Sequence, residues 1–271
     1  MMPVKKDSSG RRSVEAEVDV SGTPEQVWDA IASGPGISSW FVPTTLDERV
    51  GGATVSSFAP DHSMDSQATI TEWQPPRRFV AESTQDGPGT VATEWTVEAK
   101  AGGVCTVRVV HSWFAETDDW DNQFEGHSFG WRAFFSILRV YLKHFPGQPC
   151  TVVQLMVMST EAMPAAWGAL VGPLGLADAR VDAQVTTPQG APELSGVVEV
   201  VNPPQWPGLI ARLEKPAPGV AHLFAMPVGG QTMMPIRIYL YGNAAADLAG
   251  AIETTWRRWL GDRFPASPPG A

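Results

Sequence analysis

The chain of 271 residues has few side chains of the kinds that crosslink a fold or hold a metal: two cysteines, Cys105 and Cys150, and five histidines. Two cysteines make no disulfide framework, and their spacing is not that of a zinc site. We expect both to be small buried hydrophobes in a reducing cytosol. The sequence also has no phosphate-binding glycine loop, dinucleotide fingerprint, nucleophile elbow or zincin helix. It therefore predicts no metal and no cofactor, and it gives no support to redox, phosphoryl-transfer or serine-hydrolase chemistry.

Basic residues are scarce. The chain has 19 Lys and Arg against 29 Asp and Glu, which gives a net charge of −10. Nucleic acids and anionic membranes are bound through patches of Lys and Arg, so we expect neither as a partner. The acidic excess is concentrated up to Cys150, where 20 acidic residues face 12 basic ones.

Long apolar runs are also missing. None approaches the ~20 residues of a membrane span, and residues 1–12 are too polar for a signal peptide. We therefore expect a cytoplasmic protein, with disordered tails at 1–12 and 266–271. An apolar share of 43% with 18% charged residues is typical of a globular chain. The abundance of Arg over Lys, with 26 Gly and 24 Pro, fits a GC-rich bacterial genome.

The feature that is present is a duplication. Trp28-Asp29-Ala30 leads into Gly34-Pro35-Gly36, and Trp167-Gly168-Ala169 leads into Gly172-Pro173-Leu174-Gly175. The later markers that recur in the same order are Pro75-Pro76 and Pro203-Pro204, Val91-Ala92 and Val220-Ala221, Gly102-Gly103 and Gly229-Gly230, and the closing segments 138–146 and 256–265. This order predicts two copies of one domain, at 13–147 and 151–265, each of ordinary domain size.

Each copy has the pattern of a strand, a helix, several strands and a long closing helix. Residues 13–20 alternate as a half-buried strand does, and Thr23-Pro24-Glu25 is typical of a helix start. We expect that helix to stop at Gly34-Pro35-Gly36 and the acidic stretch 116–125 to be a solvated loop. The expected further strands are 53–58, 67–73, 78–83, 90–98 and 104–114, then 151–158, 180–186, 196–201, 208–213, 221–226 and 234–241.

This order predicts an α+β fold in which a curved antiparallel sheet wraps around one long C-terminal helix in each copy. The first closing helix carries Trp131, Phe134, Phe135 and Leu138 at helical spacing. A sheet curled around a single helix often leaves an apolar space between them. The sequence therefore favours an apolar cavity in the first copy.

Several elements of the first copy also occur together, in this order, in a known family. They are residues 24–31, Trp40-Phe41-Val42-Pro43, Gly51-Gly52, residues 71–79, residues 103–111 and Gly130-Trp131. In these elements the first copy resembles the START-like (SRPBCC, Bet v 1-like) superfamily, and within it the domain named from the activator of the heat-shock-protein-90 ATPase. The second copy lacks a counterpart of Trp40-Phe41, so its membership depends on the internal repeat.

The resemblance implies two tandem helix-grip domains with a pocket for an apolar or aromatic small molecule. It does not imply one chemistry, because the superfamily includes lipid carriers, hormone receptors, polyketide aromatases and cyclases, and chaperone-binding modules. The link to a chaperone activator also suggests a role in the stress response.

Strand alternation predicts which residues line the cavity. If Arg108 faces water, His111 and Trp113 face inward, and outward Glu94 places Trp95 inward. Trp40-Phe41 lies at the usual entrance of the pocket, where it forms either a ligand wall or a packing contact between helix and sheet. The predicted ligand-binding residues are Trp40, Phe41, Trp95, His111, Trp113, Trp131 and Phe135.

His111 is the one candidate catalytic residue. Its imidazole could bind a ligand carbonyl or phenol, act as a general acid or base, or simply be satisfied by a hydroxyl such as that of Thr93 or Ser136. The internal alignment places His222 where the first copy has Thr93, and Leu240 where it has His111. Two equivalent catalytic sites are therefore not expected.

We therefore expect non-enzymatic binding of an apolar or aromatic small molecule in the first domain. Two alternatives remain open. One is a cyclase or dehydratase acting on a polyketide-like substrate through His111. The other is a chaperone-type module with a protein partner, which predicts an exposed apolar patch outside the cavity.

Overall fold

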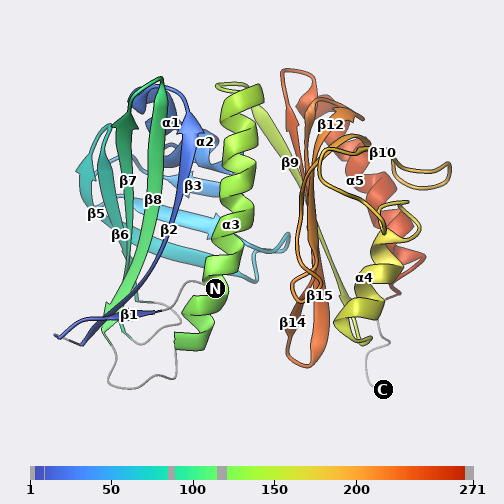
Figure 1. The fold of residues 1–271 in the computed structure, drawn as a ribbon, viewed down its shortest axis with the longest axis horizontal. Helices are drawn as coiled ribbons and strands as arrows, with labels where there is room; N and C mark the ends of the chain where they lie inside the picture. The colour runs from blue at the N-terminus through green and yellow to red at the C-terminus, as the bar shows by residue number, and fades with distance from the viewer. Residues whose placement is uncertain (1–3, 9, 85–88, 115–120, 266–271) are drawn as a thin grey trace. The chain divides into compact units, whose positions relative to one another are not determined.

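The computed structural model describes residues 4–8, 10–84, 89–114 and 121–265, and of residues 121–129 it describes the backbone alone. The chain divides into two compact units, Met1–Gly147 and Gln148–Ala271. Each contains an antiparallel sheet with helices, so the predicted α+β class is confirmed (Figure 1). Within these ranges no helix has both the length and the hydropathy that a membrane crossing requires. The tail predicted at 266–271 lies outside the described residues.

The first unit is built on an eight-stranded sheet with the order β1-β2-β8-β7-β6-β5-β4-β3. All of its neighbouring strands are antiparallel. Its strands are β1 (Lys5–Lys6), β2 (Arg11–Ser21), β3 (Thr44–Leu46), β4 (Ala53–Ser57), β5 (Asp65–Gln74), β6 (Arg78–Ser83), β7 (Val91–Lys100) and β8 (Val104–Phe114). The long helix α3 (Asp121–His144) packs against β2 and runs along one face of the sheet (Figure 1).

Helix α1 (Pro24–Ala32) begins where the sequence predicts. The Thr23 side chain accepts a hydrogen bond from the Gln26 backbone N–H, and the Gln26 side chain accepts one from the Thr23 N–H. This reciprocal pair satisfies two N–H groups that a helix start otherwise leaves unbonded.

Helix α1 ends at Ala32, just before Gly34-Pro35-Gly36, as the sequence predicts, but a second helix that was not predicted, α2 (Gly34–Ser38), begins there. Ser33 has extended backbone angles, which end α1, and its hydroxyl accepts a hydrogen bond from the Gly36 N–H, which caps α2. Proline in the first turn of a helix loses no intrahelical bond, so it suits this position.

Two further expectations for the first unit need correction. Residues 1–12 were expected to be disordered, but Lys5–Lys6 forms β1 by pairing with Ser13 and Arg12, and β2 already begins at Arg11. The acidic stretch 116–125 was expected to be a loop, but α3 begins at Asp121. Acidic residues stabilise the first turn of a helix through its dipole, which explains why they extend into α3. Residues 115–120 of this stretch lie outside the described residues.

The second unit is built on a seven-stranded sheet. Its strands are β9 (Cys150–Ser159), β10 (Gln184–Thr186), β11 (Ser195–Val201), β12 (Gly208–Lys215), β13 (Gly219–Phe224), β14 (Met226–Val228) and β15 (Gln231–Tyr241). Its helices are α4 (Met163–Val171) and α5 (Ala245–Gly261). Trp256 and Leu260 of α5 share a buried core with Ile236 and Ile238 of β15.

The two sheets share one strand order. The first reads β2-β8-β7-β6-β5-β4, and the second reads β9-β15-β13-β12-β11-β10. Both also have a register shift at the corresponding place, between Ile70 and Glu72 in β5 and between Val198 and Val200 in β11. Because β-bulges are kept within families, this common bulge supports the predicted duplication.

The residue-by-residue alignment of the two copies is wrong in one hairpin. In the first unit Val97 pairs with Val107, ten positions on, whereas in the second unit Leu223 pairs with Ile236, thirteen positions on. The second hairpin is therefore longer by three residues. An odd shift moves each side chain to the other face of a strand. Ala221 and Leu223 consequently lie in the core, and His222 faces away from it instead of taking the inward place of Thr93.

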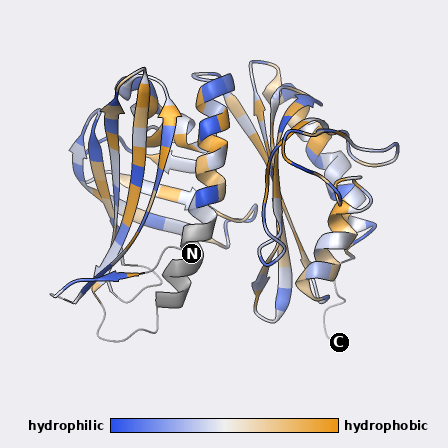
Figure 2. Ribbon diagram, in the orientation of Figure 1, coloured by the Kyte–Doolittle hydropathy of each residue, from blue (hydrophilic) through white to orange (hydrophobic). Residues whose placement is uncertain are grey.

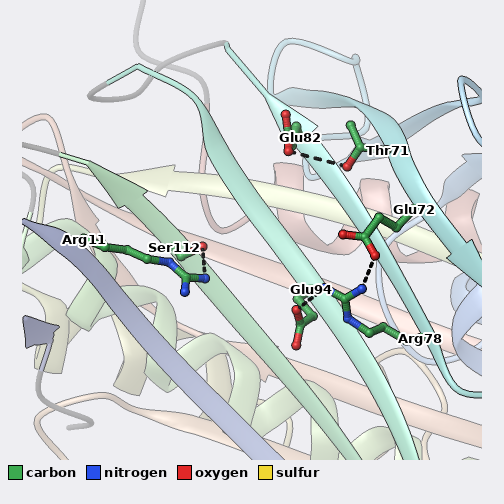
Figure 3. A network of polar contacts seen from close by, with 7 residues as sticks. All are labelled: Arg11, Thr71, Glu72, Arg78, Glu82, Glu94 and Ser112. Atoms are coloured by element: carbon green, nitrogen blue, oxygen red, sulfur yellow. Dashed lines mark hydrogen bonds and ion pairs between the residues drawn. The ribbon is translucent and has the colours of Figure 1, made fainter. Parts of the chain in front are cut away.

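The outer surface of the first sheet carries a network of charged side chains (Figure 3). Arg78 donates hydrogen bonds to Glu72 and to Glu94, the latter at 2.7 Å. The bond to Glu94 is the largest cause of a raised Arg78 pKa. Arg78 thus links strands β5, β6 and β7 across three positions of the sheet.

Replacing Arg78 with glutamine is expected to lower the free energy of unfolding by about 1 kcal/mol, because partly exposed ion pairs are weakened by water. The loss should shrink at high salt concentration, where the pairs are screened. Urea unfolding followed by circular dichroism would measure it. The matched control is Arg77→Gln, which removes a neighbouring exposed arginine that has no ion pair in the described structure. Equal losses for the two variants would contradict the assigned role of Arg78.

Candidate functional site

The candidate site lies between the sheet and α3 of the first unit. Helix α3 presents Phe134, Phe135, Leu138 and Tyr141 as buried side chains. Hydrophobic and hydrophilic segments alternate along its ribbon, as expected of a helix with one apolar stripe (Figure 2). Strand β8 presents Val107 and Val109, both completely buried. The predicted helix-grip arrangement therefore forms the interior of this unit.

Five predicted site residues come together in what we call the inner aromatic cluster: Trp40, Phe41, Trp95, Trp131 and Phe135. The Phe41 and Trp131 rings are stacked with their centroids 5.1 Å apart, and Trp95 meets Trp131 edge-on at the same separation. Trp40 lies 6.2 Å from Phe135. These separations are those of favourable ring pairs, so the cluster is a packed group of rings.

His111 lies at the border of the inner aromatic cluster and is bonded on both sides of its ring. The Trp131 indole Nε1–H donates to His111 Nε2 at 2.7 Å, and His111 Nδ1 lies 2.9 Å from the Thr93 hydroxyl. An indole N–H can only donate, so Nε2 must accept. The proton of the neutral imidazole is then on Nδ1, which donates to Thr93 Oγ1.

The hydrogen bonds resolve part of what the sequence left open about His111. Thr93 is one of the two hydroxyls proposed as its partner. The other, Ser136, donates instead to the backbone carbonyl of Arg132. The indole of Trp131 as the second partner was not foreseen. Strand alternation placed His111 inward and helical spacing placed Trp131 inward, but neither pattern carries information about which atoms meet between the sheet and α3.

Trp113 occupies a different part of the interior from most of the predicted set. It is 1% exposed and belongs to a small core group with Val14, to which Val4 and Val91 add partly buried contacts. The N-terminal strands thus cover Trp113. The sequence placed it beside His111 because both lie on the inner face of β8, but positions two apart on a strand are separated by roughly 7 Å.

Trp40 connects the inner aromatic cluster to α1. It is completely buried, and its indole N–H donates to the Ala30 backbone carbonyl at 2.8 Å. Its ring also contacts Phe41 and Trp95. This geometry is that of a packing contact between helix and sheet, one of the two roles that the sequence left open for Trp40-Phe41.

Three rings beside the cluster were not among the predicted site residues. Phe134 packs on Phe41 with centroids 4.4 Å apart, Phe58 meets Phe41 edge-on at 5.6 Å, and Phe79 of β6 stacks on Trp95 at 6.1 Å. The helical spacing of α3 already identified Phe134 as a core residue. Phe79 could have been found from the alternation of β6, since its neighbour Arg78 faces outward.

The second unit has no histidine among its core residues. His222 stacks on Phe224 at 4.8 Å, and Arg237 lies over the same ring at 5.5 Å. Burial and, to a smaller extent, the positive charge of Arg237 together lower the pKa of His222 to about 3. Burial also lowers the pKa of Arg237 and raises that of Tyr239. The surroundings of His222 therefore differ from those of His111, because the His222 ring points away from the core of its unit and the His111 ring borders the inner aromatic cluster.

The described residues contain no group of three or more side chains suited to hold a metal ion. Cys105 and Cys150 are free thiols, the first buried and the second half-buried. Burial raises the pKa of the Cys105 thiol, which disfavours the reactive thiolate. Neither cysteine lies in the inner aromatic cluster.

Comparison with known proteins gives a match for the first unit. Residues 21–143 match the family model described as Activator of Hsp90 ATPase homolog 1-like protein. No curated protein matches the chain.

Solved structures with similar folds share little sequence with this chain. CalU16 from Micromonospora echinospora is 18% identical, over 53% of this chain and 85% of that one, with a TM-score of 0.42. MLL2253 from Mesorhizobium loti is 20% identical, over 49% and 98%, with a TM-score of 0.43. DynU16, described as a putative protein in the dynemicin biosynthetic locus, is 14% identical, over 92% and 96%, with a TM-score of 0.43.

The family match runs from the last residue of β2 to the last turn of α3, and so covers α1, α2, strands β3 to β8 and the closing helix of the first unit. It does not extend into the second unit, which has the same strand order and a β-bulge at the corresponding place. The resemblance stated from the sequence is confirmed. Residues 21–143 form an Activator of Hsp90 ATPase homolog 1-like domain of the START-like superfamily.

Proposed function

We propose that the first unit binds a compact apolar or aromatic small molecule between its sheet and α3, next to His111 and Trp131. The observation that carries the proposal is a polar pair enclosed by aromatic rings, joined by the 2.7 Å bond from Trp131 to His111. Small-molecule sites are mostly apolar with a few well-placed polar groups. The family supports ligand-binding or cyclase-like roles in general.

The polar pair favours a ligand that carries a hydroxyl group on its ring. Trp131 offers a hydrogen-bond donor and His111 Nε2 an acceptor. A hydroxyl group can accept from the first and donate to the second at once, so it can be inserted between them without leaving either unbonded. A ligand lacking this group would separate the pair and lose both bonds, which is the basis of strong discrimination in polar pockets.

Trp131 is the ring that must move to admit a ligand. It is 8% exposed, whereas Trp40 is 0% exposed and is bonded to α1. Its stacking partner Phe41 is also slightly exposed. Displacement of the Trp131 indole would open the space between Phe41, Trp95 and His111, where aromatic faces are available to a flat guest.

We propose binding in preference to turnover because of the way His111 is bonded. A general base needs a free lone pair within reach of the substrate. The lone pair of His111 Nε2 accepts from Trp131, and Nδ1 donates to Thr93. A ligand hydroxyl that takes the place of the indole N–H at Nε2 replaces one hydrogen bond with another, which is a binding role for the imidazole.

Titration with naphthol, followed by calorimetry, tests the proposal. Wild-type protein is expected to bind naphthol more tightly than methoxynaphthalene, which can accept from Trp131 but cannot donate to His111. His111→Leu should weaken naphthol binding by about tenfold, corresponding to one lost hydrogen bond. It should leave methoxynaphthalene binding within about twofold of wild type.

The matched control for this experiment is His62→Ala, which removes an exposed histidine that bonds Ser57 and Asp65. It should bind naphthol as the wild type does. Equal affinity of wild type and His111→Leu for naphthol, with unchanged near-ultraviolet circular dichroism, would overturn the proposed site. So would equal affinity of wild type for the two probes.

A further inference from the structure

A surface pocket of about 390 Å³ lies on the first unit, outside the inner aromatic cluster. It is bounded by α1 and the residue that follows it, by the segment between β3 and β4, and by the turn between β5 and β6. Its lining residues are Glu25, Trp28, Asp29, Ala32, Ser33, Glu48, Pro75 and Pro76. Its volume is within the range of small-molecule sites, at the lower end.

One face of α1 forms a wall of this pocket. Glu25, Trp28, Asp29 and Ala32 follow the spacing of a single helix face, and all four line the pocket. The opposite face buries Val27, Ala30 and Ile31 in the interior. Helix α1 therefore presents apolar side chains on two sides. One side packs into the core, and the other places Trp28 in the wall of the pocket.

The pocket is acidic and contains no cation of its own. Three carboxylates line it, on Glu25, Asp29 and Glu48, and no Lys or Arg does. Across the described parts of the chain, none of the three forms an ion pair. A bound positive charge would therefore be attracted by three carboxylates that have no ion-pair partner of their own among these residues.

The placement of Asp29 goes against the local preferences of a helix. It lies four residues after Glu25, and like charges at this spacing repel each other. It also lies near the C-terminal end of α1, where the helix dipole favours cations and disfavours anions. Departures of this kind from local rules are expected at functional sites, where a ligand compensates for them.

Trp28 adds an aromatic surface next to these carboxylates. Its ring is half-buried and is held edge-on by Trp73 at 5.2 Å and by Phe79 at 5.8 Å. Tryptophan is the best aromatic partner for a cation, and Pro75 and Pro76 complete an apolar wall. An aromatic face and several carboxylates together are the features that recognise an alkylated ammonium group.

We propose that this pocket binds a small organic cation, of the protonated or quaternary amine class. The ammonium group lies against Trp28 within reach of the carboxylates of Glu25, Asp29 and Glu48, and its alkyl substituents contact Pro75 and Pro76. The site is separate from the one between the sheet and α3, so it can be tested independently of the function proposed above.

Calorimetric titration with choline, and with its neutral carbon isostere dimethylbutanol, tests the proposal in the full chain. Choline is expected to bind with roughly millimolar or tighter affinity at low salt, and at least tenfold more tightly than the neutral isostere. Its affinity should fall as ionic strength rises. Asp29→Asn and Trp28→Leu should each weaken choline binding by roughly fivefold.

The matched control is Glu98→Gln, which removes an exposed carboxylate on β7 outside the pocket and should leave choline binding unchanged. Because Asp29 is exposed, Asp29→Asn keeps the fold even if Trp28→Leu weakens it. The proposal is overturned if choline does not bind, if the isostere binds equally well, or if Asp29→Asn has no effect. A lysine-rich peptide that binds far more tightly than choline would also overturn it, in favour of a protein partner.

Discussion

Replacing Trp40 with alanine is expected to lower the free energy of unfolding of the first unit by about 4 kcal/mol. Trp40 is completely buried, and its ring contacts Phe41, Trp95 and Phe135. The substitution also removes the hydrogen bond to the Ala30 carbonyl. It combines the loss of a large buried surface with the loss of the contact that ties α1 to the interior.

Hydrogen exchange in the full chain measures the loss of stability of the first unit separately from that of the second. Amides of β7 and β8 should lose protection in Trp40→Ala, while those of β15 keep theirs. Trp40→Phe is the graded control, since it keeps a ring and should lose about 1–2 kcal/mol. A loss below 1 kcal/mol for Trp40→Ala would show that the surrounding rings close over the vacated space, contrary to the packing described here.

A second large effect is expected from acid, through His222. Burial lowers its pKa to about 3, from an ordinary value near 6.5. Between these values the unfolded chain binds a proton that the folded chain does not, so stability falls as pH decreases. Well above pH 6.5 the imidazole is neutral in both the folded and the unfolded chain, so it does not change the free energy of unfolding. From pH 7 to pH 4 the loss due to His222 is about 3 kcal/mol.

The His222 effect is isolated by comparing wild type with His222→Gln, because both proteins contain the same carboxylates. The wild type should lose about 3 kcal/mol more than the variant between pH 7 and pH 4 in urea unfolding. The charged group nearest to His222 in the register is Arg237, which opposes protonation and acts in the same direction. Parallel pH profiles for the two proteins would contradict the burial of His222 as a neutral ring.

Sequence patterns predicted most of this fold because they depend on local chemistry. The alternation along β2, β7 and β8 can be read from residues that are close in the sequence. The same is true of the capping residues before α1. The short helix α2 was missed because a Gly-Pro-Gly segment usually ends a helix, and nothing local indicates that Ser33 caps a new one. Helix propensity alone does not predict that Pro35 lies in the first turn of a new helix.

The candidate site was predicted less completely, because its details depend on contacts between distant segments. Strand alternation predicted that His111 and Trp95 face the interior, and helical spacing predicted the same of Trp131; the structure places the three together. It could not predict that Trp131 bonds His111, or that Trp113 joins Val14 instead. The surface pocket around Trp28 was not foreseen either, since its three segments are far apart in the sequence.

The longer hairpin of the second unit accommodates its extra length without any change in which strand face is interior. Val97 lies opposite Val107 in the first unit and Leu223 lies opposite Ile236 in the second, and all four side chains are buried. The three additional residues therefore lie toward the turn of the hairpin, beyond these pairs. Because buried side chains set the register of the paired strands, the length of the turn can vary while the interior stays the same. A comparison of the two units by residue number fails at this hairpin, whereas a comparison by strand pairing holds.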